Sequence, residues 1–269
     1  MFKKYFYLSL TIIFFHGSCL HAEDEIRYPM FVGQLANFGF WEEAVDAAIS
    51  YDERVESQKN LYRHVARKLT LSNEDTVLDV GCGLGGGTIL IFDEFHPNKI
   101  FGIDSSKARI EEAAKTRQSS VQFLQMNAAE MLNFANDSFD KAFSIEAVQH
   151  FERSSFLKEA FRVLKPDGQL VVASIFTKSK EASKRANELL SFPGGISLWQ
   201  PIDDFVESLR DAGFEAIVVD AISDKVWYAI SKWIRQNKLL LPWSEWPTGY
   251  SEGLYDYYVI SAKKFPLIQ

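Results

Sequence analysis

Short apolar runs alternate along the chain with longer stretches in which apolar residues recur every three or four positions. The apolar runs are rich in β-branched and aromatic residues and predict strands at 76–80, 99–103, 121–126, 139–145, 169–176, 214–221 and 255–262. The amphipathic stretches predict helices at 42–49, 54–71, 87–95, 104–117, 154–164, 201–210 and 226–236, with a further short helix after 130. Strands that alternate with helices form right-handed βαβ units, so the pattern predicts an α/β domain on a parallel sheet.

A single domain is predicted for residues 23–269, because no repeat, low-complexity tract or linker interrupts the pattern. Helices within 23–71 come before the first strand and predict a small helical cap. The core is expected in 72–176 and 201–269. The segment 177–200 is less regular and is broken by Pro193-Gly-Gly195, so we interpret it as an insertion over the site.

The first 22 residues have the pattern of a secretory signal. Lys3 and Lys4 precede an apolar run at 5–15, and the small residue Ala22 stands just before an acidic stretch. The run is short for a membrane-spanning helix. We therefore expect export to the periplasm or the medium; the alternative is that the segment is retained and the domain stays cytoplasmic or membrane-associated.

Charge and cysteine content narrow the function classes. The 269 residues carry 29 basic and 36 acidic side chains, a net charge of −7, which argues against a dedicated nucleic-acid binder and favours a small-molecule substrate. Cleavage after Ala22 would leave Cys82 alone and exclude an intramolecular disulfide. His64 and His96 have no partners at metal-ligand spacing, so no metal is expected.

A glycine-dense turn joins the first predicted strand to a helix. Strand, glycine turn and helix form a nucleotide-binding loop, because glycines let the backbone approach the ligand and the helix N-terminus faces it. The turn fits a dinucleotide fingerprint through Gly81, Gly83 and Gly86, with Asp104 near the position that reads a ribose. Asp79 argues against that ligand, because a carboxylate aimed at the loop repels a pyrophosphate and suits a cation.

The stretch 77–86, Val-Leu-Asp-Val-Gly-Cys-Gly-Leu-Gly-Gly, resembles the first motif of the class I S-adenosylmethionine-dependent methyltransferases. The resemblance implies a Rossmann-like sheet of seven strands, mostly parallel with an antiparallel last strand, and helices on both faces. In that family the loop holds the methionine part of the cofactor, and the acid after the second strand, here Asp104, binds both ribose hydroxyls.

Further motifs agree with this family. They lie at 126–130, where Asn127 replaces the usual aspartate at the adenine, at 138–150, and at 162–170, where Asp167-Gly168 replaces two glycines. Asn37-Phe-Gly-Phe-Trp41 is similar to a segment of the tocopherol- and sarcosine-methyltransferase-like branch, which modifies small molecules. The cofactor residues that the resemblance implies are Asp79, Gly81, Cys82, Gly83, Gly85, Asp104, Ser105, Asn127, Ala128, Ala129, Glu146 and Gln149.

His150 is the candidate general base. It follows the fourth predicted strand at its carboxyl end, where open α/β sheets bind ligands, and its ordinary pKa suits neutral pH. A histidine that contacts the cofactor or caps a helix is the equally weighted alternative. Glu146 could instead meet a cationic amine substrate, and Cys82 reads as a small loop residue rather than a nucleophile.

Aromatic residues gather in the cap and the C-terminal part of the chain. Trp41 and Trp199 are the candidate substrate contacts. The Trp-rich stretch 239–247 either closes over an apolar substrate or packs on the sheet, and it could also touch a membrane or a lipid-like substrate.

These features predict a methyltransferase that uses S-adenosylmethionine, releases S-adenosylhomocysteine, and methylates oxygen, nitrogen or carbon of a small, apolar or amphipathic molecule. Two alternatives stay open from the sequence: a cofactor-binding interaction module without turnover, and an NAD-dependent oxidoreductase.

Overall fold

The structure is a computed structural model that describes residues 30–45, 47–116, 118–189, 199–239 and 243–266. The predicted signal segment 1–22 lies outside the described residues. So do residues 190–198 of the predicted insertion 177–200.

Seven strands form one sheet in the order β3-β2-β1-β4-β5-β7-β6. The strands are β1 (Thr76–Val80), β2 (Lys99–Asp104), β3 (Val121–Gln125), β4 (Phe139–Ile145), β5 (Leu164–Thr177), β6 (Glu215–Ala221) and β7 (Tyr255–Lys263). The pairs β1–β2, β1–β4, β2–β3 and β4–β5 are parallel, whereas β7 is antiparallel to both β5 and β6. The predicted seven-stranded sheet with an antiparallel last strand is therefore confirmed.

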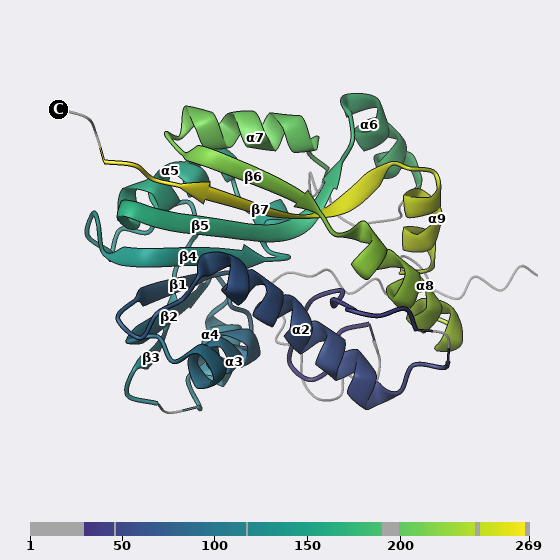
Figure 1. Cartoon of the computed structure of the whole chain (residues 1–269), viewed down its shortest axis with the longest axis horizontal. Coiled ribbons are helices and arrows are strands. Elements are labelled where there is room, and N and C mark those ends of the chain that lie inside the picture. The colour runs from purple at the N-terminus through teal and green to yellow at the C-terminus, as the bar shows by residue number, and fades with distance from the viewer. Residues whose placement is uncertain (1–29, 46, 117, 190–198, 240–242, 267–269) are drawn as a thin grey trace, which may run out of the picture.

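The described helices surround this sheet (Figure 1). They are α2 (Tyr51–Leu69), α3 (Gly86–Phe95), α4 (Lys107–Ala113), α5 (Arg153–Val163), α6 (Lys180–Leu189), α7 (Ile202–Asp211), α8 (Trp227–Gln236) and α9 (Trp246–Ser251), with short 3₁₀ turns η1 (Val148–His150), η2 (Ser223–Lys225) and η3 (Trp243–Glu245).

Alternate residues of the strands feed two hydrophobic cores, one on each face of the sheet. Val77 and Phe143 join the core under α2 and α3, whereas their neighbours Leu78 and Ala142 join the core under α5. The alternation is the two-residue period of a strand, and burial on both faces explains why the strands read as continuous apolar runs.

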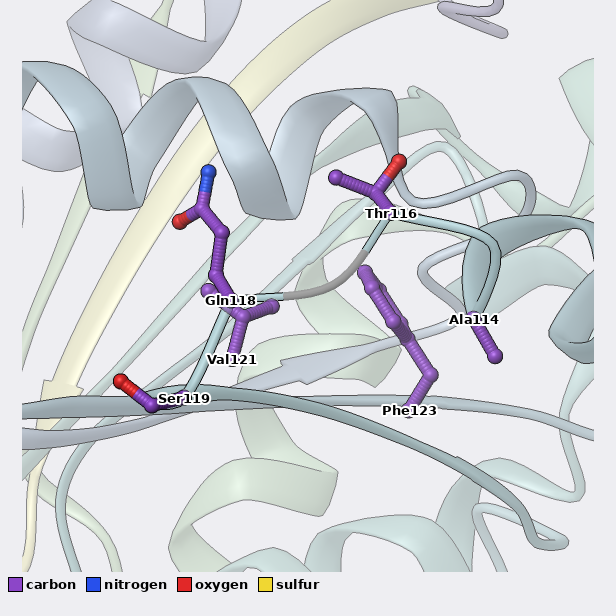
Figure 2. Close-up of a pocket in the computed structure, with 6 residues that line it drawn as sticks. All are labelled: Ala114, Thr116, Gln118, Ser119, Val121 and Phe123. Atoms are coloured by element: carbon purple, nitrogen blue, oxygen red, sulfur yellow. The ribbon is translucent and has the colours of Figure 1, made fainter.

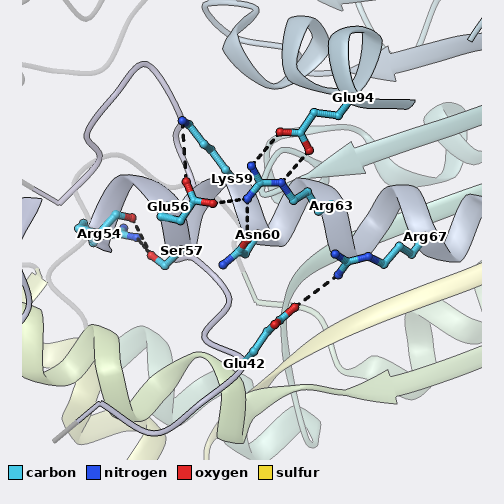
Figure 3. Close-up of polar contacts among 9 residues, drawn as sticks. All are labelled: Glu42, Arg54, Glu56, Ser57, Lys59, Asn60, Arg63, Arg67 and Glu94. Atoms are coloured by element: carbon cyan, nitrogen blue, oxygen red, sulfur yellow. Dashed lines mark hydrogen bonds and ion pairs between the residues drawn. The ribbon is translucent and has the colours of Figure 1, made fainter. Parts of the chain in front are cut away.

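Helix α2 is held at its start and along its exposed side. A capping box at Ser50 and Glu53 satisfies the first backbone N–H groups. Farther along, Arg63 makes a two-pronged contact with Glu94 of α3, its Nε and Nη2 lying 2.7 and 2.8 Å from the carboxylate oxygens (Figure 3). This contact fixes α2 beside the helix that follows the glycine loop.

The elements that we call the cap, α6, α8, α9 and the segment 30–41, lie at the end of the sheet to which the β4 arrow points (Figure 1). There α6, α8 and α9 lie near the segment 30–41, which passes beside α2. The carboxyl ends of the parallel strands, and with them the predicted site, face this cap.

The helix predicted at 42–49 is wrong, because the described residues of that segment form bends. Side chains of α8 and the turn before it bind the backbone groups that a helix would use internally. Lys225 and Lys232 donate to the carbonyls of Glu42 and Val45 at 3.0 Å each, and Gln236 binds both the N–H and the carbonyl of Ile49.

The short helix predicted after residue 130 is also wrong; the described chain makes turns there. Arg162 of α5 donates to the carbonyls of Met131 and Phe134, at 3.0 and 2.8 Å, and Glu159 accepts from the Met131 N–H at 2.7 Å. Helix α4 ends at Ala113, earlier than the predicted 117.

Candidate active site

The glycine loop after β1 is built from left-handed backbone that only glycine adopts without strain. Gly81, Gly83 and Gly85 have φ of 84°, 55° and 81°. A Cβ on Gly81 would come 2.3 Å from the Cβ of Ala147, whereas a Cβ on Gly83 would meet nothing within 4 Å. The loop is thus closely packed at its base and open at Gly83, where a ligand can approach the backbone.

Asp79 lies beneath this loop and is 2 % exposed. Its Oδ2 accepts a 2.6 Å hydrogen bond from the Thr88 hydroxyl at the start of α3. Burial raises the pKa of Asp79 to about 7, and the nearby Asp104 adds to the rise, while the bond from Thr88 opposes it. An adjacent cation would favour the ionised form, as the expected sulfonium and amino groups require.

Asp104 ends β2 and turns its carboxylate toward the loop. Its Oδ2 accepts from the Gly83 N–H at 3.1 Å, and its Oδ1 accepts from the Ser106 N–H at 2.9 Å. Arg109 lies 3.7 Å away. Ser105, next to it, is exposed. The two predicted acids therefore flank one loop, with Asp79 below it and Asp104 beside it.

The loop after β3 carries the residues expected at the adenine. Asn127 is exposed, and its Oδ1 accepts from the Ala129 N–H at 3.0 Å, so the amide nitrogen is the end that can turn to a base. Ala128 is buried. Met126 donates its N–H to the Asp104 carbonyl at 3.0 Å, which places this loop beside the end of β2.

Glu146 and Gln149 follow β4 and are tied to protein groups. Glu146 Oε1 accepts from the Phe38 N–H at 2.6 Å and from the Tyr257 hydroxyl at 2.9 Å. Gln149 donates to the Glu146 carbonyl at 2.7 Å and accepts from the Ser174 hydroxyl at 2.9 Å. Part of Glu146 stays exposed, but desolvation of its carboxyl group raises its pKa to about 7 against these hydrogen bonds and the charge of Arg54.

His150 ends the turn η1, and its surroundings lower its pKa. Desolvation acts first, followed by the positive charges of Arg109 and Arg153, although the residue as a whole is exposed. The imidazole is therefore neutral near pH 7 and able to accept a proton.

Trp41 and Trp199 are both buried, at 8 and 7 % exposure. The Arg54 guanidinium lies 5.6 Å from the centre of the Trp41 ring. Trp199 stacks on Tyr255 at 5.1 Å and meets Trp246 at 5.5 Å. Trp199 thus joins an aromatic cluster that we define as Phe38, Trp199, Trp227, Trp246, Tyr250 and Tyr255.

Cys82 is 5 % exposed, and desolvation raises the pKa of its thiol well above the usual range, so it is no nucleophile at neutral pH.

Three residues that the sequence analysis did not single out adjoin the site residues: Arg54 beside Phe38, Tyr62 beside Gly87 and Tyr257 beside Glu146. All three are buried. Tyr62 lies against Gly87, where a Cβ would come 2.0 Å from its ring, and its pKa is raised well above normal by burial and then by Asp79. These residues lie on α2 and β7, where the apolar pattern predicts only core packing, so their polar groups were not recognised. Gly87 was the one available sign that an aromatic ring, that of Tyr62, packs close to the backbone.

Two hollows lie apart from this site. One, of about 320 Å³, lies beside the start of β3 and is lined by Ala114, Thr116, Gln118, Ser119, Val121 and Phe123 (Figure 2). The other, of about 240 Å³, is lined by residues 41 to 45 and by residues around the start of α8, so the candidate substrate contact Trp41 borders this hollow. Neither involves the glycine loop or the two acids.

Among the described residues, no group of three histidine, cysteine or acidic side chains could hold a metal ion, and no helix is long and apolar enough to cross a membrane. The open Gly83 backbone and the buried Asp79 carboxylate fit a ligand that is cationic at one end.

Comparison with known proteins points to one chemistry. A family described as a methyltransferase domain matches residues 78–172. Erythromycin 3''-O-methyltransferase of Saccharopolyspora erythraea is 30% identical over 76% of this chain and 70% of its own. O-methyltransferase resE of Aspergillus sclerotiorum is 33% identical over 76% of each chain.

Solved structures share the fold. Geranyl diphosphate C-methyltransferase from Streptomyces coelicolor A3(2), solved with S-adenosyl-L-homocysteine, aligns with a TM-score of 0.70 and 16% identity over 90% of this chain and 97% of its own. The [4+2]-cyclase SpnF aligns with a TM-score of 0.66 and 22% identity over 86% of this chain and 87% of its own.

Proposed function

Because the chain belongs to the class I S-adenosylmethionine-dependent methyltransferases, we propose that it methylates a hydroxyl oxygen of a small apolar or amphipathic molecule. Methyl transfer from this cofactor to a small molecule is the family's reaction; the acceptor atom and the apolar character of the acceptor are the proposal. The observation that carries it is the aromatic cluster, whose Phe38 N–H binds Glu146 just after β4, together with two O-methyltransferase relatives.

The cofactor, when bound, supplies an electrophilic methyl group on a sulfonium. Asp79 provides negative charge below the glycine loop for the cationic end, and Asp104 offers carboxylate oxygens for ribose hydroxyls. The open face of Gly83 lets the cofactor approach the backbone.

The protein's part in the transfer is to align the acceptor oxygen with the methyl group, to exclude water and to remove one proton. The aromatic cluster supplies an apolar wall for the acceptor. His150, neutral at pH 7, is our candidate to take the hydroxyl proton.

Replacing His150 by alanine tests this role. We expect kcat to fall about 100-fold or more, because a positioned base contributes at least that factor, while the affinity for S-adenosylhomocysteine stays within about twofold. Turnover is followed by the formation of S-adenosylhomocysteine with alcohol, quinol and amine acceptors. Unchanged kcat in His150→Ala would show that His150 is not the base, and binding without turnover on every acceptor would favour an interaction module.

A lipid-like acceptor and contact with a membrane are a further part of the proposal. The tryptophans of the Trp-rich stretch 239–247 pack toward the protein interior, which favours contact with an acceptor inside the protein. Trp246 is 6 % exposed within the aromatic cluster, and Trp243 meets Phe31 edge-on at 5.4 Å. Flotation of the protein with anionic and zwitterionic vesicles tests the contact, and no binding to either sets it aside.

A further inference from the structure

A buried cation and a carboxylate grip the cap segment 30–41 at one residue. The Phe38 carbonyl accepts from Arg54 Nη1 at 3.3 Å, and the Phe38 N–H donates to Glu146 Oε1 at 2.6 Å. Arg54 is fully buried in α2 and Glu146 follows β4, so two distant elements hold the same residue from both sides. Their charges attract, since the Arg54 charge opposes the rise in the pKa of Glu146.

Arg54 binds the same segment through its second amino group as well, while Nη1 also donates to the Ser57 hydroxyl at 3.2 Å and the buried Nε has no partner among the described residues. Its Nη2 binds the carbonyls of Met30 and Asn37, at 2.8 Å each. Burial lowers the pKa of Arg54 to about 9, so the guanidinium stays charged at neutral pH. A buried charge is costly unless it is hydrogen-bonded, and here both Nη groups bind backbone carbonyls rather than a carboxylate.

The same segment passes over the start of α3. A Cβ on Gly86 would lie 3.1 Å from the Gln34 carbonyl oxygen and 3.3 Å from Leu35 Cδ2. Gln58 of α2 donates to the Leu35 carbonyl. The segment therefore covers the helix start that follows the glycine loop.

At its other end the segment forms part of the aromatic cluster. The Phe38 ring lies 5.4 Å from Trp227 and 5.2 Å from Trp246. One short segment thus touches the cofactor loop through Gln34 and Leu35 and the acceptor wall through Phe38.

Glu146 has an unusual backbone for a glutamate. Its φ is 48°, in the left-handed region, which costs a non-glycine residue free energy. The turn follows directly after β4, and the side chain ends on Phe38 and Tyr257. Tyr257 is fully buried on β7, so Glu146 joins the cap segment to the sheet.

We propose that Glu146 is a positioning residue that, with Arg54 and Tyr257, clamps the cap segment 30–41 across the start of α3 and holds Phe38 in the aromatic cluster. This inference rests on the methyltransferase function above. It assigns Glu146 to holding the cap closed, in place of proton transfer or direct contact with an amine.

The test removes one bond of the clamp and measures the segment directly. Tyr257→Phe deletes the hydroxyl that orients Glu146, and Glu146→Ala deletes the acceptor. Tyr258→Phe is the matched control, because Tyr258 is the next residue of the same strand and belongs to the core on the opposite face. Amide hydrogen exchange over 30–41 and the Kd for S-adenosylhomocysteine are compared in all variants.

We expect exchange at Phe38 to rise about tenfold in Tyr257→Phe and further in Glu146→Ala, since each lost hydrogen bond favours local opening by about that factor. The Kd should rise about fivefold or more in parallel, and Glu146→Gln, which keeps an acceptor oxygen, should recover most of both. With an acceptor that is turned over, the acceptor KM should rise more than kcat falls.

Folded Glu146→Ala with wild-type exchange at Phe38 and wild-type Kd overturns the clamp, and so does a fall in kcat alone. If Glu146→Ala does not fold, Tyr257→Phe decides by the same two measurements. If the wild type turns over no acceptor, the proposed function fails, and exchange and cofactor binding still test the clamp.

Discussion

Asp79 favours binding of a cationic ligand at a cost to the stability of the folded protein. Its carboxyl is buried against one hydroxyl donor, so its ionised form is costly until a cation arrives. The folded-state pKa of about 7 lies above the ordinary value of 3.8. The contribution of this group to stability is therefore complete below about pH 4 and is lost as the pH rises through 7.

Asp79→Asn should consequently be more stable than the wild type at alkaline pH, yet bind the cofactor less well. We expect a gain on the order of 4 kcal/mol in the free energy of unfolding above about pH 8, because each pKa unit corresponds to about 1.4 kcal/mol, and no gain near pH 4. Affinity for S-adenosylmethionine should fall about tenfold. Urea unfolding across pH and calorimetric titration measure the two.

Glu74→Gln, an exposed acid just before β1, is the control and should shift neither measurement. Asp79→Asn with a pH-independent gain would show that charge is not the cause. Unchanged affinity would remove Asp79 from the cofactor site.

At the scale of elements, the glycines of the glycine loop have two roles. One allows close packing against the protein, and the other leaves the backbone open to a ligand. Gly81 and Gly83 both need left-handed backbone, but only Gly81 faces a neighbouring atom. The distinction separates two uses of the same residue type within one turn.

Gly83→Ala should fold with a loss of about 1 kcal/mol from backbone strain and should raise the cofactor Kd at least about tenfold, because the methyl group fills the open space. Gly81→Ala should lose about 3 kcal/mol or more, since its Cβ collides with Ala147. Thermal unfolding with and without S-adenosylhomocysteine measures both.

The matched control is Gly253→Ala, at a turn before β7 with φ of 73° and open space around it. It should show the strain of Gly83→Ala without its loss of binding. Equal loss of binding in both variants would contradict a cofactor role for Gly83.

The local sequence pattern predicts the helices and strands whose backbone N–H and C=O groups bond to other backbone groups rather than to distant side chains. The strands and α2, α3, α5, α7 and α8 follow from periodicity, and the glycine loop with Asp79 and Asp104 follows from a motif within one βαβ unit. The helices predicted at 42–49 and after 130 do not form, because side chains distant in the sequence bind the backbone groups of these segments. Lys225, Lys232 and Gln236 bind the first segment, and Glu159 and Arg162 bind the second. The same reason hid Arg54, whose partners are carbonyls 16 to 24 residues away.

At the scale of the whole molecule, the site is shared by both ends of the chain. The cap segment near the N-terminus meets Tyr257 of the last strand through Glu146. The segment 1–22 that precedes this cap is predicted to be a secretory signal.

Sequencing the N-terminus of the protein from its native host should give Glu23 as the first residue. Removal of Lys3 and Lys4 then makes the net charge −9, from 27 basic and 36 acidic side chains. A start at Met1 would contradict the prediction that the segment 1–22 is a cleaved secretory signal. The 23–269 protein should unfold at the same temperature as the full chain, within about 2 °C, because the signal is expected to contribute nothing to the folded domain.

The capture of residues 42–49 by α8 also sets an order of events during synthesis. Their carbonyl and N–H partners are 183 to 187 residues farther along the chain. The ribosome makes residues 42–49 early, yet their final conformation must wait for the last quarter of the polypeptide to emerge. Residues 42–49 are therefore translated early but are among the last to settle, and a nascent chain stalled before Lys225 would hold the five parallel strands β1 to β5 without the contacts that fix this segment.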